Sequence, residues 1–189
     1  NGDGSFTEAA KAHGVDFTDA SHTPSFCDYD RDGDLDLYVM TNRWYREEGF
    51  PQEQTIEIGP NGPRVRKKYE RYYAARQTGD DKWESHVVGR PDLLCRNDGS
   101  GKFEVVNESA GIRHRGHGLS ATWWDWNGDG WTDLWVGNDF QDEDRIYLNR
   151  GPSDPDGQVT FLDVTRYVVG HLTWYSMGAD FGDLNGDGL

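Results

Sequence analysis

The sequence predicts an all-β fold built from β-propeller blades, each a unit of four short antiparallel strands. Two observations support this prediction. An acidic loop of nine residues recurs in one register, and the segments around it are short, rich in β-branched and aromatic residues, and bounded by Gly and Asp turns. Glycine makes up 24 of the 189 residues, which suits a fold with many turns. No segment between these strands has the pattern of a helix that would connect parallel strands.

Two landmarks define the repeat. The acidic loops begin at three aspartates, Asp28, Asp125 and Asp183, with spacings of 97 and 58 residues. A turn that ends in Phe recurs with the same two spacings, at Phe6, Phe103 and Phe161. Because two unrelated features recur at the same two spacings, an internal repeat explains them better than chance. The longer first spacing indicates an insertion in the first complete unit.

We expect four segments along the chain. They are the end of a preceding blade at 1–13, a blade at 14–110 with an insertion at about 44–90, a blade at 111–169, and the start of a further blade at 170–189. A closed propeller needs at least four blades. We therefore expect this chain to form an arc of a larger ring, with a truncated third repeat.

Each complete unit presents its strands in the same order. The predicted strands are residues 34–40, 93–98 and 102–109 in the first unit, and residues 132–138, 145–149 and 160–167 in the second. The strand that leads into the acidic loop completes each set of four.

The insertion differs in charge from the rest of the chain. Residues 43–90 hold more than half of the 19 Lys and Arg residues, whereas the whole chain has a net charge of −15. Within it, Val65, Tyr69, Tyr72 and Tyr73 have helical spacing, which predicts a helix over residues 64–76. Our hypothesis is that the insertion reaches a protein or glycan partner. The alternative, a blade loop packed on its own propeller, remains open.

The acidic loops have the pattern of a site for a hard cation. Oxygen-bearing side chains occupy positions one, three, five and nine, and a Gly at position six permits the tight turn that aims the carbonyl of position seven inward. The predicted metal ligands are Asp28, Asp30, Asp32, Asp34 and Asp36 in loop A, Asp125, Asn127, Asp129, Trp131 and Asp133 in loop B, and Asp183, Asn185 and Asp187 in loop C.

Calcium is the expected ion, because it accepts six to eight oxygen ligands in flexible geometry. Magnesium demands a stricter octahedron, and zinc is disfavoured because no Cys or His enters the loops. An EF-hand would need a Glu at position twelve, where this chain has Val39 and Val136. The competing interpretation is that the loops are Asp-Gly turns that bond only their own backbone. Three loops with clustered charge favour the metal.

The strings DYDRDGDLDLYV and DWNGDGWTDLWV, each followed by a short RN-type strand and a Gly-x-Phe turn, resemble the FG-GAP or VCBS repeats of integrin-α-like β-propellers. The run RNDGSGKFEVVNESAGI is similar to bacterial relatives of cartilage acidic protein. This resemblance covers most of the chain outside the insertion. It implies blades around a central axis, with calcium in the hairpin loop between the first two strands. It implies little about the partner, since such repeats occur in adhesion receptors, lectin-like modules and domains attached to enzymes.

Other side chains carry weaker signals. Cys27 and Cys95 occupy core-strand positions, and their pairing in a disulfide remains open. His114 and His117 are weak candidates for a metal site, and the run GNDFQDED is interpreted as a solvated loop. Five tryptophans near loop B suit packing between blades better than stacking on sugars. They are Trp123, Trp124, Trp126, Trp131 and Trp135.

The negative charge argues against nucleic acid as a partner, and no stretch of 18 apolar residues predicts a membrane span. No catalytic motif is present, so we expect no enzymatic activity in this segment. The leading hypothesis is a calcium-binding module for adhesion, binding or scaffolding, located outside the cell, on its surface or in the periplasm. Its partners would include the remaining blades of the same propeller. One alternative is the propeller of a polysaccharide-degrading or carbohydrate-binding enzyme, and another is a subunit of a surface assembly or filament.

Overall fold

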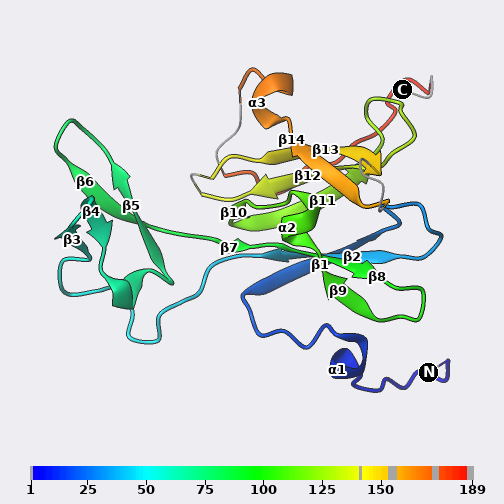
Figure 1. Cartoon of the computed structure of the whole chain (residues 1–189), viewed down its shortest axis with the longest axis horizontal. Helices are drawn as coiled ribbons and strands as arrows, with labels where there is room; N and C mark the ends of the chain where they lie inside the picture. The colour runs from blue at the N-terminus through cyan, green and yellow to red at the C-terminus, as the bar shows by residue number, and fades with distance from the viewer. Residues whose placement is uncertain (1, 141, 153–156, 172–174, 187–189) are drawn as a thin grey trace.

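Loop A and loop B each join the first two strands of a four-stranded antiparallel sheet (Figure 1). The computed structural model describes residues 2–140, 142–152, 157–171 and 175–186. The first sheet has the order β1 (Ser21–Cys27), β2 (Asp36–Thr41), β8 (Leu93–Asn97) and β9 (Phe103–Val105). The second has the order β11 (Gly118–Trp124), β12 (Asp133–Asn138), β13 (Arg145–Pro152) and β14 (Val159–Asp163). The predicted all-β fold with four-stranded antiparallel sheets is confirmed, and it is consistent with a fragment of a β-propeller.

The two sheets repeat one register. Cys27 lies opposite Asp36 at the end of the first hairpin, and Trp124 lies opposite Asp133 at the end of the second. The register of both hairpins shifts near the start of the first strand. The last residue of each acidic loop is therefore the first residue of the second strand, which fixes its carboxylate at the base of the loop.

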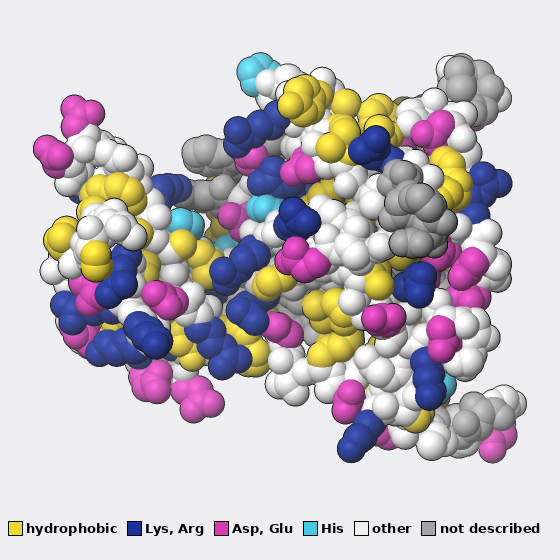
Figure 2. Space-filling view, in the orientation of Figure 1, with side chains coloured by type: hydrophobic (Ala, Val, Ile, Leu, Met, Phe, Trp, Pro, Cys, Tyr) yellow, Lys and Arg dark blue, Asp and Glu magenta, His cyan; other side chains and the backbone are white. Residues whose placement is uncertain are grey.

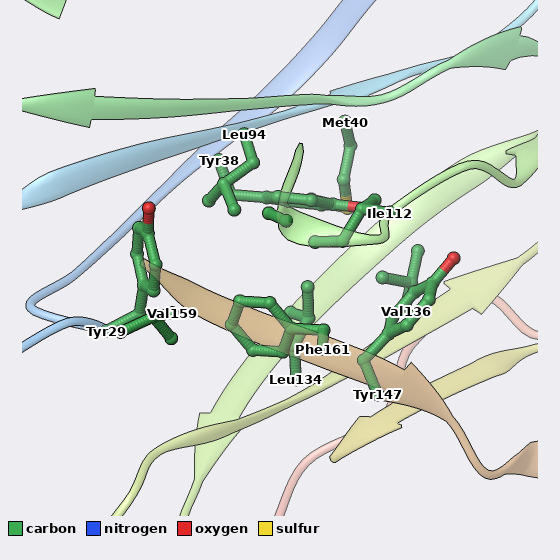
Figure 3. Packing of buried hydrophobic residues seen from close by; sticks show 11 residues of the cluster. Tyr29, Tyr38, Met40, Leu94, Ile112, Leu134, Val136, Tyr147, Val159 and Phe161 are labelled. Atoms are coloured by element: carbon green, nitrogen blue, oxygen red, sulfur yellow. The ribbon is translucent and has the colours of Figure 1, made fainter. Parts of the chain in front are cut away.

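The sheets pack face to face around a shared core (Figure 3). Alternation along β2 explains how one strand serves two faces, because Tyr38 and Met40 enter this core while Leu37 and Val39 join a smaller cluster on the other side. The remaining core residues are Tyr29, Leu94, Ala110, Ile112, Leu134, Val136, Tyr147, Val159 and Phe161. Both sheets and the segment that links them thus share one apolar interior.

A short helical turn follows each Phe that marks the repeat. These turns are α1 (Ala10–His13), α2 (Asn107–Ala110) and α3 (Thr165–Val168). The first two end at Gly14 and Gly111, which have φ of 76° and 82°. A Cβ at Gly14 would lie 2.7 Å from the carbonyl oxygen of Phe103, and one at Gly111 would lie 2.7 Å from that of Phe161. Glycine is required at both positions by the same close approach to the next sheet.

The insertion between β2 and β8 consists of hairpins rather than a helix. It contains β3 (Ile56–Gly59) paired with β4 (Gly62–Val65), the 3₁₀ turn η1 (Lys67–Tyr69), and β5 (Tyr73–Gln77) paired with β6 (Trp83–Val87). The helix expected over residues 64–76 is replaced by β4, η1 and β5. Pairing of β4 with β3 and of β5 with β6 overrides the helical spacing. The ring of Tyr69 in η1 packs edge-on against that of Tyr73 in β5, with 6.3 Å between the ring centres.

The hairpins lie beside the two sheets rather than on them (Figure 1). A short ladder of β7 (Arg90–Pro91) with β10 (Arg115–Gly116) connects the end of the insertion to the second unit. In the segment 64–76, only Val65 and Tyr69 are buried. The hypothesis that this segment meets a partner therefore remains open.

Cys27 and Cys95 are free thiols in different clusters. Cys95 is fully buried, and burial raises the pKa of its thiol to about 11. Trp123 packs edge-on against Tyr38, and Trp135 contacts Phe181 of the third repeat. Trp124 and Trp126 remain 39% and 37% exposed. No helix in the described residues is long and apolar enough to cross a bilayer.

Candidate metal site

Loop A is a tight turn held by its own carboxylates. Gly33 has a φ of 97°, and its backbone N–H donates to Asp28 Oδ2 at 3.2 Å. Asp34 N–H donates to Asp32 Oδ1 at 3.1 Å. Arg31, at position four, has a φ of 61°, where loop B has Gly128 at 72°. The same left-handed conformation at positions four and six shows that the two loops share one backbone path.

Three predicted ligands converge in loop A. One carboxylate oxygen from each of Asp28, Asp30 and Asp36 lies within 4.8 Å of the others. Asp36 is 1% exposed, while Asp28 and Asp30 are half-buried. Asp28 Oδ1 and Asp34 Oδ1 are buried and have no hydrogen-bond partner among the described residues. A buried acceptor without a donor is costly, so these oxygens favour a bound cation.

The electrostatics of loop A also favour a bound cation. Burial, together with the charges of Asp30 and Asp32, raises the pKa of Asp36 to about 7, against the effect of hydrogen bonds from Asn97 and Tyr29. Burial and the charge of Asp32 also raise the pKa of Asp30. A cation among these oxygens would relieve the repulsion, and an all-oxygen donor set fits calcium. Asp32, at position five, is exposed at the rim of this group.

Loop B has the same backbone path as loop A, but its side-chain oxygens have different hydrogen-bond partners. The Asp125 carboxylate accepts N–H bonds from Gly128 at 2.9 Å and Gly130 at 2.8 Å. The Asn127 amide donates to Asp129 Oδ2 at 2.9 Å. Burial, then the charges of Asp129 and Asp125, raise the pKa of Asp133 to about 6. In the part of the chain that the structure describes, the loop B carboxylates do not form a close group like that of loop A.

The residues at position seven differ between the loops. The side chain of Asp34 is half-buried in loop A. In loop B the indole of Trp131 lies below the guanidinium of Arg31, 5.3 Å from its Cζ. The positively charged side chain of Arg31 in loop A therefore reaches toward loop B and lies between the two acidic loops.

Loop C is described only in part. Asp183 Oδ1 accepts the backbone N–H of Gly186 at 2.6 Å, as Asp125 does from Gly128. Asn185 is exposed. Asp187 lies outside the described residues, so its place in the loop stays a prediction.

Two asparagines support the loops and were missed by the sequence analysis. Asn97 N–H donates to Asp36 Oδ1 at 2.8 Å, and its amide donates to the carbonyl of Leu35 at 3.1 Å. Asn149 makes the same pair of bonds, to Asp133 Oδ1 at 2.7 Å and to the carbonyl of Thr132 at 3.1 Å. The signal that would have identified them is the Asn that ends the RN-type strand in both units.

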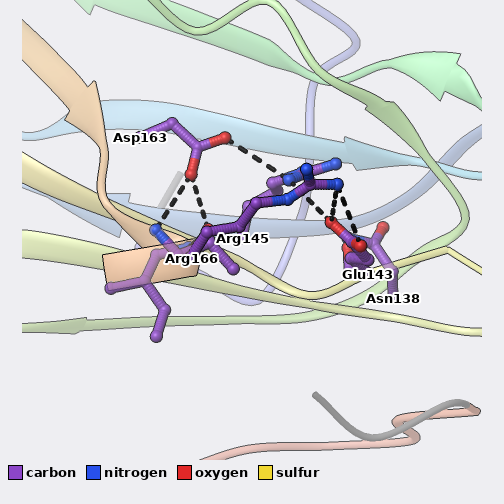
Figure 4. Close-up of polar contacts among 7 residues, drawn as sticks. Asn138, Glu143, Arg145, Asp163 and Arg166 are labelled. Carbon is purple, nitrogen blue, oxygen red and sulfur yellow. Dashed lines mark hydrogen bonds and ion pairs between the residues drawn. The ribbon is translucent and has the colours of Figure 1, made fainter. Parts of the chain in front are cut away.

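The GNDFQDED run is not a solvated loop, and that interpretation was wrong. Asp144 is 3% exposed and accepts Asn138 N–H at 2.9 Å. Figure 4 shows Glu143 held by Arg145 at 3.4 Å and Arg166 at 3.2 Å. Folding of the run against β12 and β13 satisfies these charges, which its composition alone does not reveal. His114 and His117 do not form a metal-binding group among the described residues.

Comparison with known families agrees with the repeat. Residues 125–189, which begin at the first aspartate of loop B, match the FG-GAP-like repeat family. No curated protein matches the chain. The repeat family is therefore supported directly for the second unit and the start of the third.

Proposed function

We propose that this chain is a calcium-stabilised part of a β-propeller outside the cytoplasm, and that it serves as a binding or scaffolding module. The observation that carries the proposal is the close group of Asp28, Asp30 and Asp36, with two neighbouring oxygens buried without a partner. FG-GAP-like repeats often bind calcium, and they are typical of extracellular proteins. The Asp36 and Asp133 carboxylates would close the coordination of loops A and B from below.

The location follows from calcium supply. Extracellular modules bind calcium with dissociation constants of about 10⁻⁴ to 10⁻³ M, which millimolar extracellular calcium fills. Cytosolic calcium would leave such loops without their ion. Bound calcium would stabilise the fold by linkage, because the unfolded chain lacks the preformed oxygen cage.

Further blades are the first proposed partners. Trp124 and Trp126 expose large apolar surface beside loop B, whereas Tyr29 at the same loop position as Trp126 is 2% exposed under the second sheet. A following blade would cover the tryptophans as the second sheet covers Tyr29. The role we propose for the module is binding rather than catalysis, because its clustered carboxylates are accounted for by metal ligation.

Chelation and substitution test the calcium proposal. The melting temperature should fall clearly when EDTA replaces calcium, and Asp32→Ala and Asp129→Ala should each lower the calcium content by one ion. Asp81→Ala removes an exposed carboxylate in the insertion and is the matched control, with unchanged calcium content. Equal melting with calcium and with EDTA would contradict the proposal.

A further inference from the structure

A cleft lined by charged, histidine and aromatic side chains lies between the insertion and the second unit. Its volume is about 430 Å³, within the range of small-molecule sites. The insertion contributes Arg76 and His86, Arg43 precedes it, and the second unit contributes His117 and Asp142. Figure 2 shows histidine side chains and clustered Lys and Arg side chains where the insertion meets the rest of the molecule.

His117 lines this cleft and has one ring nitrogen without a partner among the described residues. Its side chain is 3% exposed, and Nδ1 lies 2.5 Å from Asp142 Oδ2. A carboxylate only accepts, so His117 Nδ1 donates to Asp142, and Nε2 is the ring nitrogen left for another partner. Nε2 is buried and has no partner among the described residues. A hydroxyl group of a ligand suits this nitrogen, because a hydroxyl can both donate and accept a hydrogen bond.

The position of His117 is fixed by close backbone packing. A Cβ at Gly89 would lie 1.7 Å from the carbonyl oxygen of Gly116, so only glycine allows the insertion to return this close to β10. On the other side, the ion pairs of Glu143 with Arg145 and Arg166 anchor the loop that carries Asp142 (Figure 4). The His117 ring is thus held by both walls of the cleft.

Arg43 supplies a positive charge to the cleft, whose described lining also includes Arg76 and the carboxylate of Asp142. Its guanidinium lies 4.3 Å from the ring centre of Phe140 and 4.9 Å from that of Tyr45. Arg43 forms no ion pair in the described part of the chain, and its Nε is buried without a partner. In a protein with a net charge of −15, an unpaired arginine beside Arg76 makes a local site for an anion.

The aromatic residues of the cleft are held in unusual backbone conformations. Phe140 and Tyr175 have φ of 59° and 64° and are two of only three described residues other than glycine with positive φ. Tyr175 N–H donates to the carbonyl of Phe140 at 3.0 Å. Because such conformations cost free energy and concentrate at functional sites, their presence here supports a binding role for the cleft.

A second hollow continues from Arg43 into the insertion. It has a volume of about 320 Å³ and is lined by aromatic side chains. They are Trp44, Tyr45, Phe50, Tyr72 and Tyr73. Tyr45 and Phe50 are 73% and 78% exposed. Exposed rings next to an anion site suit a ligand whose apolar faces stack while its charged groups meet arginine.

We propose that these two hollows form one groove that binds an acidic saccharide. A carboxylate of the saccharide pairs with Arg43 and Arg76, a neighbouring hydroxyl hydrogen-bonds His117 Nε2, and further sugar rings stack on the aromatic side chains of the insertion. The inference rests on the binding role proposed above and names its ligand class. It is independent of the calcium loops.

Titration calorimetry with a matched pair of oligosaccharides tests the proposal. One probe is a tetramer of β-1,4-linked glucuronate, and the other is cellotetraose, which has a CH₂OH group in place of each carboxylate. We expect the acidic tetramer to bind at least about tenfold more tightly, as charged hydrogen bonds to arginine imply. Free calcium is held constant in both titrations, because acidic sugars bind calcium themselves.

Substitutions test which side chains of the groove contact which groups of the saccharide. Arg43→Gln and Arg76→Gln should each weaken the acidic tetramer about tenfold and leave cellotetraose nearly unchanged. His117→Phe should weaken both sugars, because the Phe ring has no nitrogen that can hydrogen-bond the hydroxyl. Arg64→Gln is the matched control, since Arg64 pairs with Glu57 on an exposed hairpin outside the groove. Thermal melting of each variant in calcium verifies that it folds.

Three results would overturn the proposal. They are equal affinity for the two tetramers, unchanged binding by both arginine variants, and equally tight binding of tetraglutamate, which would indicate an acidic protein partner instead. If the groove does not prefer the acidic tetramer, the melting temperature should still fall in EDTA. A failure of the calcium proposal leaves the preference for the acidic tetramer intact, so the two failures are distinguishable.

Discussion

Loop A and loop B have nearly the same sequence pattern, but only loop A is covered by a neighbouring sheet. Tyr29 of loop A is 2% exposed, its ring lies 5.5 Å from that of Phe161, and its carbonyl accepts the Asn149 amide at 2.9 Å. Trp126, the equivalent residue of loop B, is 37% exposed. Carboxylates of both loops accept bonds from their own backbone, but among the described residues only those of loop A also form a close group. In this chain, the loop that the next sheet covers is also the loop whose predicted metal ligands already lie close together.

The largest expected effect is on stability at these two aromatic positions. Tyr29→Ala should lower the free energy of unfolding by about 3–5 kcal/mol, because it leaves a cavity between the sheets. Trp126→Ala should cost about 1 kcal/mol or less, since its ring is partly in solvent. Urea unfolding of both variants in saturating calcium measures the difference. Equal losses would show that the two loops are covered alike.

The aspartate before the third strand provides a second comparison. Asp92 in the first sheet accepts Tyr38 OH and Thr41 N–H, both at 2.7 Å, while Asp144 in the second accepts Ser176 OH of the third repeat at 2.9 Å. Burial raises the pKa of Asp92 to about 6 from its ordinary value of 3.8. The folded chain therefore holds this proton more tightly than the unfolded chain does.

The stability contributed by Asp92 should be complete below about pH 4 and should be lost as the pH rises through about 6. The Asp92→Asn side chain does not ionise. The stability of the native chain minus that of Asp92→Asn should therefore increase by up to about 3 kcal/mol from pH 7 to pH 4. Unfolding of both chains at matched pH, in EDTA, measures this difference and cancels other groups. A difference that is constant across this range would refute the assignment.

The smallest expected effect is on calcium affinity, through the two supporting asparagines. Asn97→Ala and Asn149→Ala should weaken calcium binding by about 10- to 100-fold at loop A and loop B respectively, because each removes an amide donor to the loop backbone near its closing carboxylate. Asn149→Ala should also affect loop A, since its amide bonds Tyr29. Competition with a fluorescent chelator reads both sites. If Asn149→Ala leaves loop A unchanged, the two loops are not coupled through the sheet interface.

The repeat register and the strands could be predicted from the sequence, because the acidic loops and the Phe turns recur at fixed offsets. The insertion could not. Its tyrosines have helical spacing, yet the hairpin partners of β4 and β5 lie elsewhere in the insertion and decide their conformation. Local spacing carries no information on such pairing.

The candidate metal site was predictable as a set of ligands but not as geometry. The shared ligand pattern of loops A and B does not show that Tyr29 lies under the second sheet while Trp126 is partly in solvent. The His117–Asp142 pair was missed for a similar reason. The two residues lie in different loops, and only the folding of β11 to β13 brings them together.

Calorimetric titration of calcium into the chain after removal of metal tests the central claim most directly. The native chain should show a tighter site at loop A and a weaker one at loop B, Asp28→Asn should lose only the tighter site, and Asp125→Asn should lose only the weaker one. No calcium binding, or full retention of the tighter site in Asp28→Asn, would contradict the account.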